Sequence, residues 1–232
     1  MSRRLVNITL DNLADLPTRC RSCVYWELDP VAGARARENG ESALEKEAWI
    51  SDTLLEWGSC GLLSYVDSVA AGYVLYAPPA YAARSAAFPT SPPSADAVLL
   101  MAARIVPEFR GLGLGRMLIQ GVASEVSRRG IRAIEAFGRR DVPVEPDPAE
   151  TPAGPAAATT AVEPIADPHR DRYECLMPAS YLLAVGFKTV RPHQRTPRLR
   201  LDLKSTVSWR EDVEAALERV LSSLHAPATL RH

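Results

Sequence analysis

The chain has 232 residues, of which 47% are hydrophobic, and a formal net charge of −1 at pH 7. A chain of this length can bury a core of its own, as one large domain or two small ones, and near-zero net charge gives no electrostatic reason to expect nucleic acid or an anionic membrane as partner. Because no apolar run approaches the roughly 18 residues of a membrane span and polar residues interrupt the N-terminal segment where a signal peptide would be apolar, we expect a cytoplasmic protein.

The N-terminal part predicts one strand and one long helix. Weak alternation over residues 4–10 is typical of a strand, and the aromatic-rich segment 20–30 ends at Pro30. Residues 42–57 have helical periodicity and precede Gly58, a common C-terminal stop. The expected details of this helix are a capping box of Ser42 and Glu45 and an apolar stripe of Leu44, Ala48 and Leu55.

Cys20 and Cys23 form a C-x-x-C in the aromatic-rich segment. A structural zinc site needs two more Cys or His ligands at suitable spacing, but Cys60 and Cys175 stand alone and the four histidines form no pair. No thioredoxin-like strand and helix surround the motif. We therefore expect no metal site and no redox motif, but partly buried free thiols.

Three strands are predicted next. Residues 60–67 and 69–78 form two of them, joined by a tight turn at Asp67-Ser68. Segment 78–94 is rich in Pro, Ala and Ser and predicts a long loop. Residues 97–106 are almost continuously apolar, which is typical of a strand buried on both faces of a sheet.

A glycine-rich stretch follows this buried strand. Glycines alternate over residues 111–115, a helical pattern continues up to Gly130, and residues 131–138 predict a further strand. A strand, loop, helix and strand within about forty residues indicate a right-handed crossover between parallel strands. The apolar positions of the helix are Leu118, Val122 and Val126.

The remaining chain predicts an insertion and four more elements. Residues 139–172 are dominated by Pro, Ala, Thr, Asp and Glu, so we expect a disordered insertion within a single domain of residues 1–232. A short helix over 178–185 and strands over 187–190 and 198–204 follow. A last helix over 208–224 has an apolar stripe, which covers either the sheet of its own chain or a second subunit of a homodimer.

Glycine-rich turns between a strand and a helix present backbone N–H groups to anions such as phosphate. The stretch lacks the Lys-Ser/Thr of a Walker A loop. Neither register of G-x-G-x-x-G fits, because the sixth positions are Arg116 and Leu118. A third pattern, Arg/Gln-x-x-Gly-x-Gly/Ala, is met by Arg110, Gly113 and Gly115.

This third pattern resembles the acyl-CoA-binding segment of the GNAT superfamily of N-acyltransferases. "YLLAVGFKTV" is similar to the family's late helix ending in Gly-Phe and its sixth strand, and the order of elements matches from about residue 4 to 204. Segments 20–27, 88–100 and 133–138 further resemble a bacterial group within the superfamily. The resemblance implies an α/β (α+β) fold: a mixed, mostly antiparallel sheet with a central pair of parallel, splayed strands, flanking helices and an added C-terminal helix.

The resemblance also implies how acetyl-CoA would bind. Its pyrophosphate would lie on the N–H groups of the loop, and its pantetheine arm would run beside Val106 in the gap between the splayed strands. A backbone N–H near Ile105 or Val106 would stabilise the tetrahedral oxyanion. The implied cofactor-binding residues are Ile105, Val106, Arg110, Gly111, Leu112, Gly113, Leu114, Gly115 and Arg116.

Acyl transfer from a thioester to an amine needs a neutral amine, an oxyanion donor and a proton for the departing thiolate. The usual general acid in GNAT proteins is a tyrosine at a position that Leu182 occupies here. Tyr181 lies one residue earlier, about 100° around the helix, and is either the acid or a core aromatic. Cys175, just ahead of the helix, is a second candidate acid or an inert buried cysteine.

Two carboxylates are candidates for the general base. Glu27 lies in the region that shapes the acceptor pocket in GNAT folds. Glu135 interrupts an apolar strand, where a charge needs a partner or a function. Pairing with Arg104 is the structural alternative for Glu135, and a chain of water molecules could also deprotonate the amine.

The sequence therefore predicts an N-acetyltransferase that moves an acetyl group from acetyl-CoA, without a metal, to a small-molecule or peptide amine by direct attack. One alternative is a GNAT fold that binds acyl-CoA without turnover, as a sensor or interaction module; the displaced Tyr181 keeps it open. Another is a nucleotide-binding α/β protein, against which the two failed motifs count.

Overall fold

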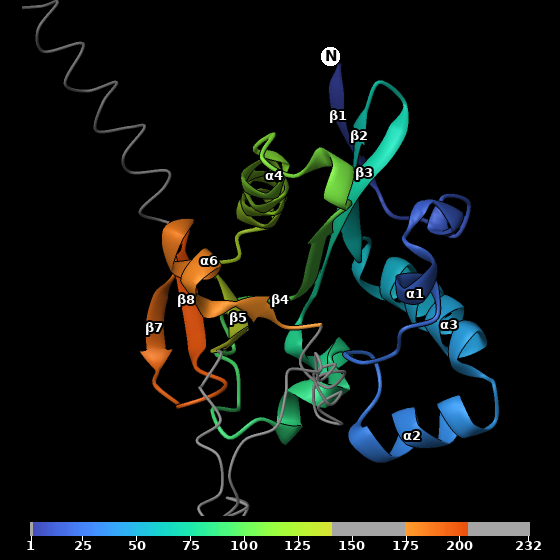
Figure 1. Ribbon diagram of the computed structural model, residues 1–232. Coiled ribbons are helices and arrows are strands. Elements are labelled where there is room, and N and C mark those ends of the chain that lie inside the picture. The colour runs from blue at the N-terminus through green and yellow to red at the C-terminus, as the bar shows by residue number, and fades with distance from the viewer. Residues whose placement is uncertain (1, 141–174, 204–232) are drawn as a thin grey trace, which may run out of the picture.

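A computed structural model describes residues 2–140 and 175–203 (Figure 1). Their centre is a sheet with the strand order β1-β2-β3-β4-β5-β8-β7, and β6 pairs with β5 outside this path. The strands are β1 Arg3–Asn7, β2 Gly61–Val66, β3 Val69–Ala77, β4 Ala97–Ile105, β5 Ala133–Arg139, β6 Met177–Pro178, β7 Lys188–Arg191 and β8 Arg198–Asp202. The helices are α1 Thr18–Arg21, α2 Pro30–Glu38, α3 Ser42–Trp57, α4 Leu114–Arg128 and α6 Ala179–Ala184. Short 3-10 turns are η1 Leu13–Asp15, η2 Pro79–Tyr81, η3 Ala83–Ala87 and η4 Pro107–Phe109.

The predicted mixed sheet is confirmed. Neighbouring strands along the path are antiparallel except β4 and β5, which are parallel and are joined by α4. These two strands pair only from Ala97 and Ala133 to Leu99 and Glu135, and then diverge (Figure 1). The predicted splay of the central parallel pair is therefore present.

Helices cover both faces of the sheet (Figure 1). The segment with α1, α2 and α3 packs on one face, where Leu99 and Met101 of β4 join its core. The helices α4 and α6 pack on the other face, where Val98 and Leu100 of β4 are buried. The continuous apolar run of β4 therefore reflects burial on both sides, as the sequence predicted.

The buried face of α3 differs from the predicted one. Leu44 and Leu55, expected in the core, are 67% and 82% exposed. The buried positions are instead Lys46, Ile50 and Thr53. The predicted stripe was wrong because Lys46 enters the core with a charged partner, which hydrophobic periodicity cannot reveal.

The predicted capping box of α3 is also wrong. Its N-cap is Glu41, without a side-chain bond to the helix, and the Ser42 hydroxyl has no hydrogen-bond partner. At the other end Gly58 has φ 84°, so the predicted glycine stop is correct.

The sequence reading missed α2 and the two-residue β6. Asp29 Oδ1 accepts from the N–H groups of Val31 at 2.8 Å and Ala32 at 3.0 Å, and Pro30 occupies the first turn. Both are ordinary start signals of a helix. The apolar signal that should follow them is weak, because this helix buries only Gly33 and Ala36.

Two predicted segments lie outside the described residues: the helix over 208–224 and the insertion over 139–172, apart from its first two residues. Arg139 ends β5, and the N–H of Arg140 donates to the carbonyl of Arg195 at 2.8 Å. Among the helices of the described ranges, none has the length and apolar character to cross a membrane.

Candidate active site

The C-terminal half of β4 turns backbone groups toward the side from which β5 has diverged. The N–H of Val106 donates to the carbonyl of Ala71 at 2.9 Å, and Ile105 lies opposite Gly72 of β3. Because backbone groups alternate in direction along an antiparallel strand, those of Ile105 point away from β3. The N–H of Val106 is thus not an oxyanion donor, whereas that of Ile105 faces the gap.

A bulge marks the middle of β4. The register with β3 shifts between Leu75 and Tyr76, so Met101 is an extra residue. Met101 and Ala102 consequently lie on the same face of the sheet although they are consecutive. The bulge lies just beyond Leu99, where the pairing with β5 ends.

The glycine loop enters α4 through two left-handed residues. Gly111 has φ 79° and Gly113 has φ 76°, and a Cβ atom added to either would meet nothing within 4 Å. These glycines are therefore required by backbone conformation, and the space in front of them is open. The first N–H groups of α4 have no intrahelical acceptor and, with the helix dipole, favour an anion.

The start of α4 is anchored on the sheet. Leu114 is only 1% exposed and packs with Val66 and Ala71. The guanidinium of Arg3 donates to the carbonyl of Leu112 at 2.9 Å. The loop is thus held by its apolar and carbonyl groups, which leaves its amides for a ligand.

Gly115 has a different reason to be glycine. A Cβ atom there would lie 2.5 Å from the hydroxyl oxygen of Tyr181. Tyr181 therefore lies against the first turn of α4, while Leu182, at the usual family position, is fully buried in the core. Burial raises the pKa of Tyr181, and the charge of Arg116 partly offsets the rise, so this hydroxyl is a proton donor at neutral pH.

Two solved structures have a fold similar to this chain. The PaiA N-acetyltransferase of Thermoplasma acidophilum, in complex with coenzyme A, has a TM-score of 0.50 at 12% identity, over 87% of this chain and 99% of that one. An N-acetyltransferase from Staphylococcus aureus Mu50 has a TM-score of 0.50 at 10% identity, over 88% and 99%. No family model and no curated protein sequence matches the chain.

The chain has the GNAT fold. The parallel pair, its splay and the glycine loop before α4 are the parts of this fold that the sequence resemblance implied. At these identities the likeness establishes the fold.

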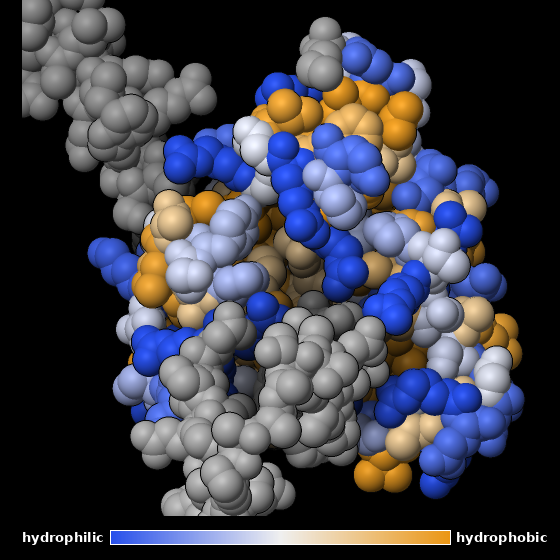
Figure 2. Space-filling view, in the orientation of Figure 1, coloured by the Kyte–Doolittle hydropathy of each residue, from blue (hydrophilic) through white to orange (hydrophobic). Residues whose placement is uncertain are grey.

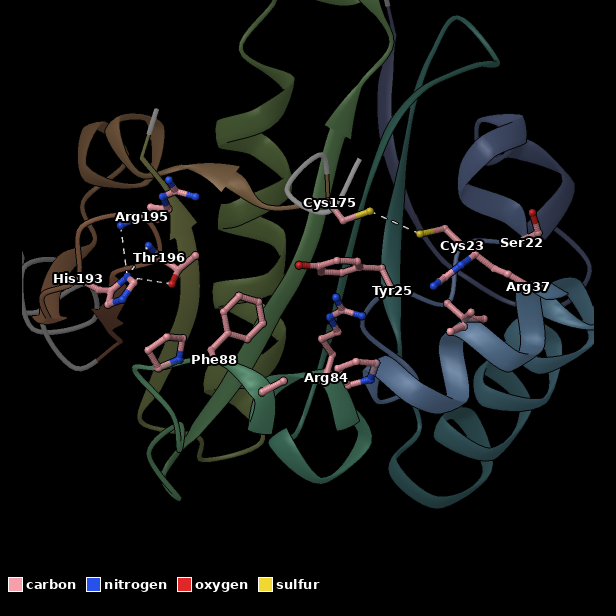
Figure 3. Close-up of a pocket in the computed structure, with 15 residues that line it drawn as sticks. Ser22, Cys23, Tyr25, Arg37, Arg84, Phe88, Cys175, His193, Arg195 and Thr196 are labelled. Atoms are coloured by element: carbon pink, nitrogen blue, oxygen red, sulfur yellow. Dashed lines mark hydrogen bonds between the residues drawn. The ribbon is translucent and has the colours of Figure 1, made fainter. Parts of the chain in front are cut away.

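A cavity of about 760 Å³ lies on the face of the sheet opposite α4 (Figure 3). Its walls come from the segment around α2, from η3 and from the β7–β8 connection. Phe88 in its wall stacks on Phe137, with ring centroids 4.3 Å apart, and on Trp26. The guanidinium of Arg84 lies 4.2 Å from the centre of the Tyr25 ring. Figure 2 shows hydrophobic residues in a central hollow with hydrophilic residues around it.

Two thiols meet in the wall of this cavity. The sulfur atoms of Cys23 and Cys175 are 3.5 Å apart (Figure 3). The hydrogen bond from Cys175 lowers the pKa of Cys23 to about 7, whereas the same contact and burial raise the pKa of Cys175. The raised pKa of Cys175 leaves this predicted acid protonated, and the thiol with the lowered pKa is Cys23. No spacing rule would have found a partner 152 residues away.

This pairing predicts the pH dependence of alkylation. Because the pKa of Cys23 is lowered to about 7, its reaction with iodoacetamide should rise about tenfold per pH unit below pH 7 and level off above it. Cys60, whose pKa burial raises to about 12, should stay unmodified. Peptide mass spectrometry over pH 5–9 gives the profile. In Cys175→Ala the midpoint should move upward; an unmoved midpoint would contradict the assignment.

Glu27, a predicted base, is a buried structural charge. Its carboxylate pairs with the ammonium group of Lys46, and both side chains are 1% exposed. The backbone N–H of Trp26 donates to it as well, at 3.0 Å. An amine substrate cannot reach a carboxylate enclosed in this way, so the prediction for Glu27 was wrong.

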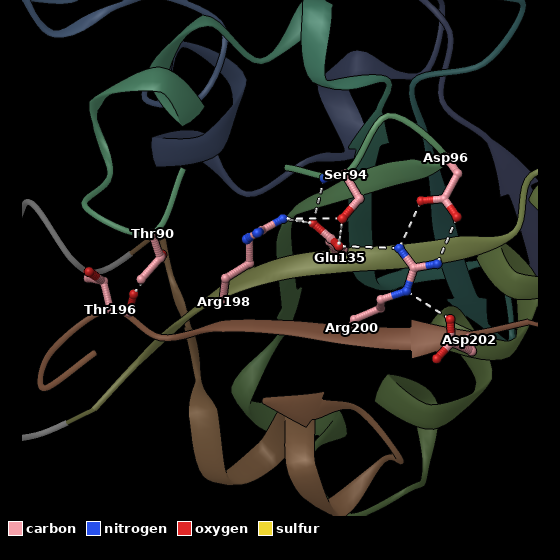
Figure 4. Close-up of polar contacts among 8 residues, drawn as sticks. All are labelled: Thr90, Ser94, Asp96, Glu135, Thr196, Arg198, Arg200 and Asp202. Carbon is pink, nitrogen blue, oxygen red and sulfur yellow. Dashed lines mark hydrogen bonds and ion pairs between the residues drawn. The ribbon is translucent and has the colours of Figure 1, made fainter. Parts of the chain in front are cut away.

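Glu135, the other predicted base, is the centre of a polar network (Figure 4). It is fully buried and accepts from the N–H of Ser94 at 3.0 Å and its hydroxyl at 2.6 Å. Arg198 and Arg200 also donate to it, at 2.5 and 3.3 Å. Glu135 pairs with these two arginines and not with Arg104, the alternative partner expected from the sequence. The network ties β8 and the loop before β4 to β5, which gives Glu135 the structural partners that a buried charge needs.

His193 lies in the β7–β8 connection at the cavity wall. Its Nδ1 accepts from the N–H groups of Thr196 at 3.0 Å and Arg195 at 3.3 Å (Figure 3). A neutral imidazole with Nδ1 as acceptor carries its proton on Nε2. His193 therefore adds an N–H donor to the residues that line the cavity, and the sequence offered no motif that would have shown it.

Within residues 2–140 and 175–203, no group of three or more His, Cys, Asp or Glu side chains is arranged to hold a metal ion. The four cysteines are free thiols, as the sequence predicted.

Proposed function

We propose that this protein is an acetyl-CoA-dependent N-acetyltransferase that acetylates a primary amine of a small molecule or peptide by direct attack. The observation that carries the proposal is the loop at Gly111 and Gly113, whose left-handed, unobstructed backbone leads into the N-terminus of α4. That loop lies directly after β4, beside the gap in the sheet. A solved structure of the same fold contains coenzyme A.

The residues divide into three roles. The amides at the start of α4, from Gly113 to Arg116, would hold the pyrophosphate of the acyl donor. The N–H of Ile105 faces the gap and would donate to the oxyanion. The cavity at Tyr25 and Phe88 would hold the acceptor amine.

No described side chain in this cavity is assigned as general base. Glu27 and Glu135 are held in ion pairs, and His193 Nδ1 is already an acceptor. Water at the cavity mouth would take the proton from the ammonium form of the acceptor before attack. The neutral amine would then attack the thioester carbon, the C–S bond would break, and coenzyme A would leave as a thiolate that solvent protonates. This mechanism predicts a rate that rises with pH toward the pKa of the acceptor.

A second candidate function is acyl-CoA binding without turnover, in a sensor or interaction module. The observation that favours it is the engagement of both candidate bases in buried ion pairs. In both functions the glycine loop binds the acyl-CoA, but only the enzyme transfers the acyl group to an amine.

Two measurements separate these functions. Acetyl-CoA, but not ATP or NAD, should raise the melting temperature under either of them. Release of free coenzyme A thiol with a panel of primary amines then identifies the enzyme, whereas binding without release identifies the sensor. Equal stabilisation by ATP and NAD would contradict both.

Tyr181→Phe tests how the tyrosine acts. Its hydroxyl lies at the first turn of α4, so we propose that it donates to the bound acyl donor rather than to the departing thiolate. Loss of one hydrogen bond to a charged group should raise the Kd for coenzyme A about tenfold and leave kcat within about twofold. A fall in kcat at unchanged Kd would instead identify Tyr181 as the general acid.

A further inference from the structure

We propose that the acceptor carries an anionic group, a carboxylate or a phosphate, and that the cavity lined by Arg37, Arg84, Arg195 and His193 binds it. The inference rests on the proposed function only in naming this anion as part of the acceptor; the anion site itself rests on the cavity.

The first observation is the charge of the cavity lining. Among the residues that the structure describes, three arginines line the cavity and no aspartate or glutamate does. They come from α2, from η3 and from the connection after β7, so the fold brings together cations that are far apart in sequence. In Figure 3, Arg195 and His193 lie on one side of the cavity, Arg84 lies in the middle below Tyr25, and Arg37 lies on the other side.

The second observation is that these arginines have no carboxylate partner in the described part of the chain. None of the three takes part in an ion pair there. By contrast, Arg129, Arg198 and Arg200 each bind a carboxylate. Arg37 and Arg195 are exposed and Arg84 is half-buried, so within the described ranges the cavity lining carries positive charge that an anionic ligand would neutralise.

The two carboxylates near this lining, those of Glu27 and Asp29, already have other partners. Glu27 pairs with Lys46 beneath the cavity wall. Asp29 lies near enough to Arg84 to affect its own pKa, but its side chain accepts two N–H groups of α2. Neither carboxylate enters the lining, so the guanidinium groups remain donors for a ligand.

The third observation is that two of the donors are pre-oriented. The ring of Tyr25 supports the half-buried guanidinium of Arg84, with 4.2 Å between them. The backbone bonds to Nδ1 of His193 fix its tautomer with a proton on Nε2. A planar guanidinium and a fixed N–H donor in the lining of one cavity suit an oxyanion with several acceptor oxygens.

The site is tested by direct binding. The probes are inorganic phosphate and glutarate, titrated calorimetrically into the full chain with saturating coenzyme A, which occupies the anion-binding loop. At least one probe should bind, and its affinity should fall about tenfold in Arg84→Gln and in Arg37→Gln. Arg35→Gln removes a charge from the same helix outside the cavity lining and should bind like the wild type.

The outcomes are separable from those of the proposed function. Binding of phosphate alone indicates a phosphorylated acceptor, and binding of glutarate alone indicates a carboxylate. Absence of binding by both probes, or equal affinities in Arg84→Gln, Arg37→Gln and wild type, overturns the anion site. Failure of coenzyme A to bind would overturn the proposed function, while the dependence of probe affinity on Arg84 would still decide the site.

Two matched pairs of substrates test the inference in the acetylation reaction itself. Glucosamine 6-phosphate and glucosamine differ only by the phosphate, and glycine and glycinamide differ by the carboxylate. The anionic member of at least one pair should have the higher kcat/KM, and Arg84→Gln should reduce that preference about tenfold. Equal kcat/KM within both pairs would contradict an anionic acceptor.

Discussion

Gly113→Glu is expected to weaken coenzyme A binding by a factor on the order of 100 or more. Gly113 has φ 76°, a conformation that costs most L-residues about 1–2 kcal/mol. A carboxylate there would also repel the pyrophosphate at the amides that should hold it. Isothermal titration of the variant against coenzyme A measures the loss, and circular dichroism measures the fold.

Two control variants separate charge from strain. Gly130 also has a left-handed backbone, with φ 74°, and follows the far end of α4, so Gly130→Glu should cost similar stability and leave binding unchanged. Gly113→Asn introduces a neutral residue that tolerates this conformation and should lose far less affinity. Wild-type binding by Gly113→Glu would remove the loop from the proposed site.

Glu135→Gln is expected to cost about 3–5 kcal/mol of unfolding free energy, the usual result of breaking a buried ion pair. The substitution keeps the shape of the side chain but leaves Arg198, whose side chain is 7% exposed, without its counter-charge. Urea denaturation measures the change. Coenzyme A affinity should persist in the fraction that remains folded.

Asp96→Asn is the matched control for that network. Asp96 binds Arg200 at 2.9 Å, but its side chain is 42% exposed, so its loss should cost no more than about 1 kcal/mol. If Glu135→Gln kept its stability and lost acetyl transfer, Glu135 would be a catalytic base after all.

The parts of the fold that the sequence predicted are those governed by local rules. The apolar run of β4, the glycine loop and the periodicity of α4 lie next to one another in the chain. Together they imply a parallel crossover, whose handedness and pairing follow from chain geometry. Anion binding at Gly111 and Gly113 stays a prediction from residue type and position.

The parts that failed depend on partners distant in the chain. Lys46 reads as a solvent-facing residue until Glu27 is placed beside it, and this pairing turned the buried face of α3 away from Leu44. Glu135 was correctly judged to need a partner or a function. Its partners, Arg198 and Arg200, are supplied by a strand more than sixty residues later.

The cavity could not have been predicted for the same reason. Its walls combine segments around residues 22–37, 84–89, 175 and 193–196. No spacing in any of them implies the others. Tertiary packing alone places Cys23 against Cys175, and Arg84 and His193 in the lining of one cavity.

The short stretch from Cys175 to Tyr181 joins the two halves of the site. Cys175 touches Cys23 in the cavity wall, and Tyr181, six residues later, touches Gly115. Between them Met177 and Pro178 are clamped to β5. One short run of chain, held on β5, therefore reaches from the cavity wall to the first turn of α4.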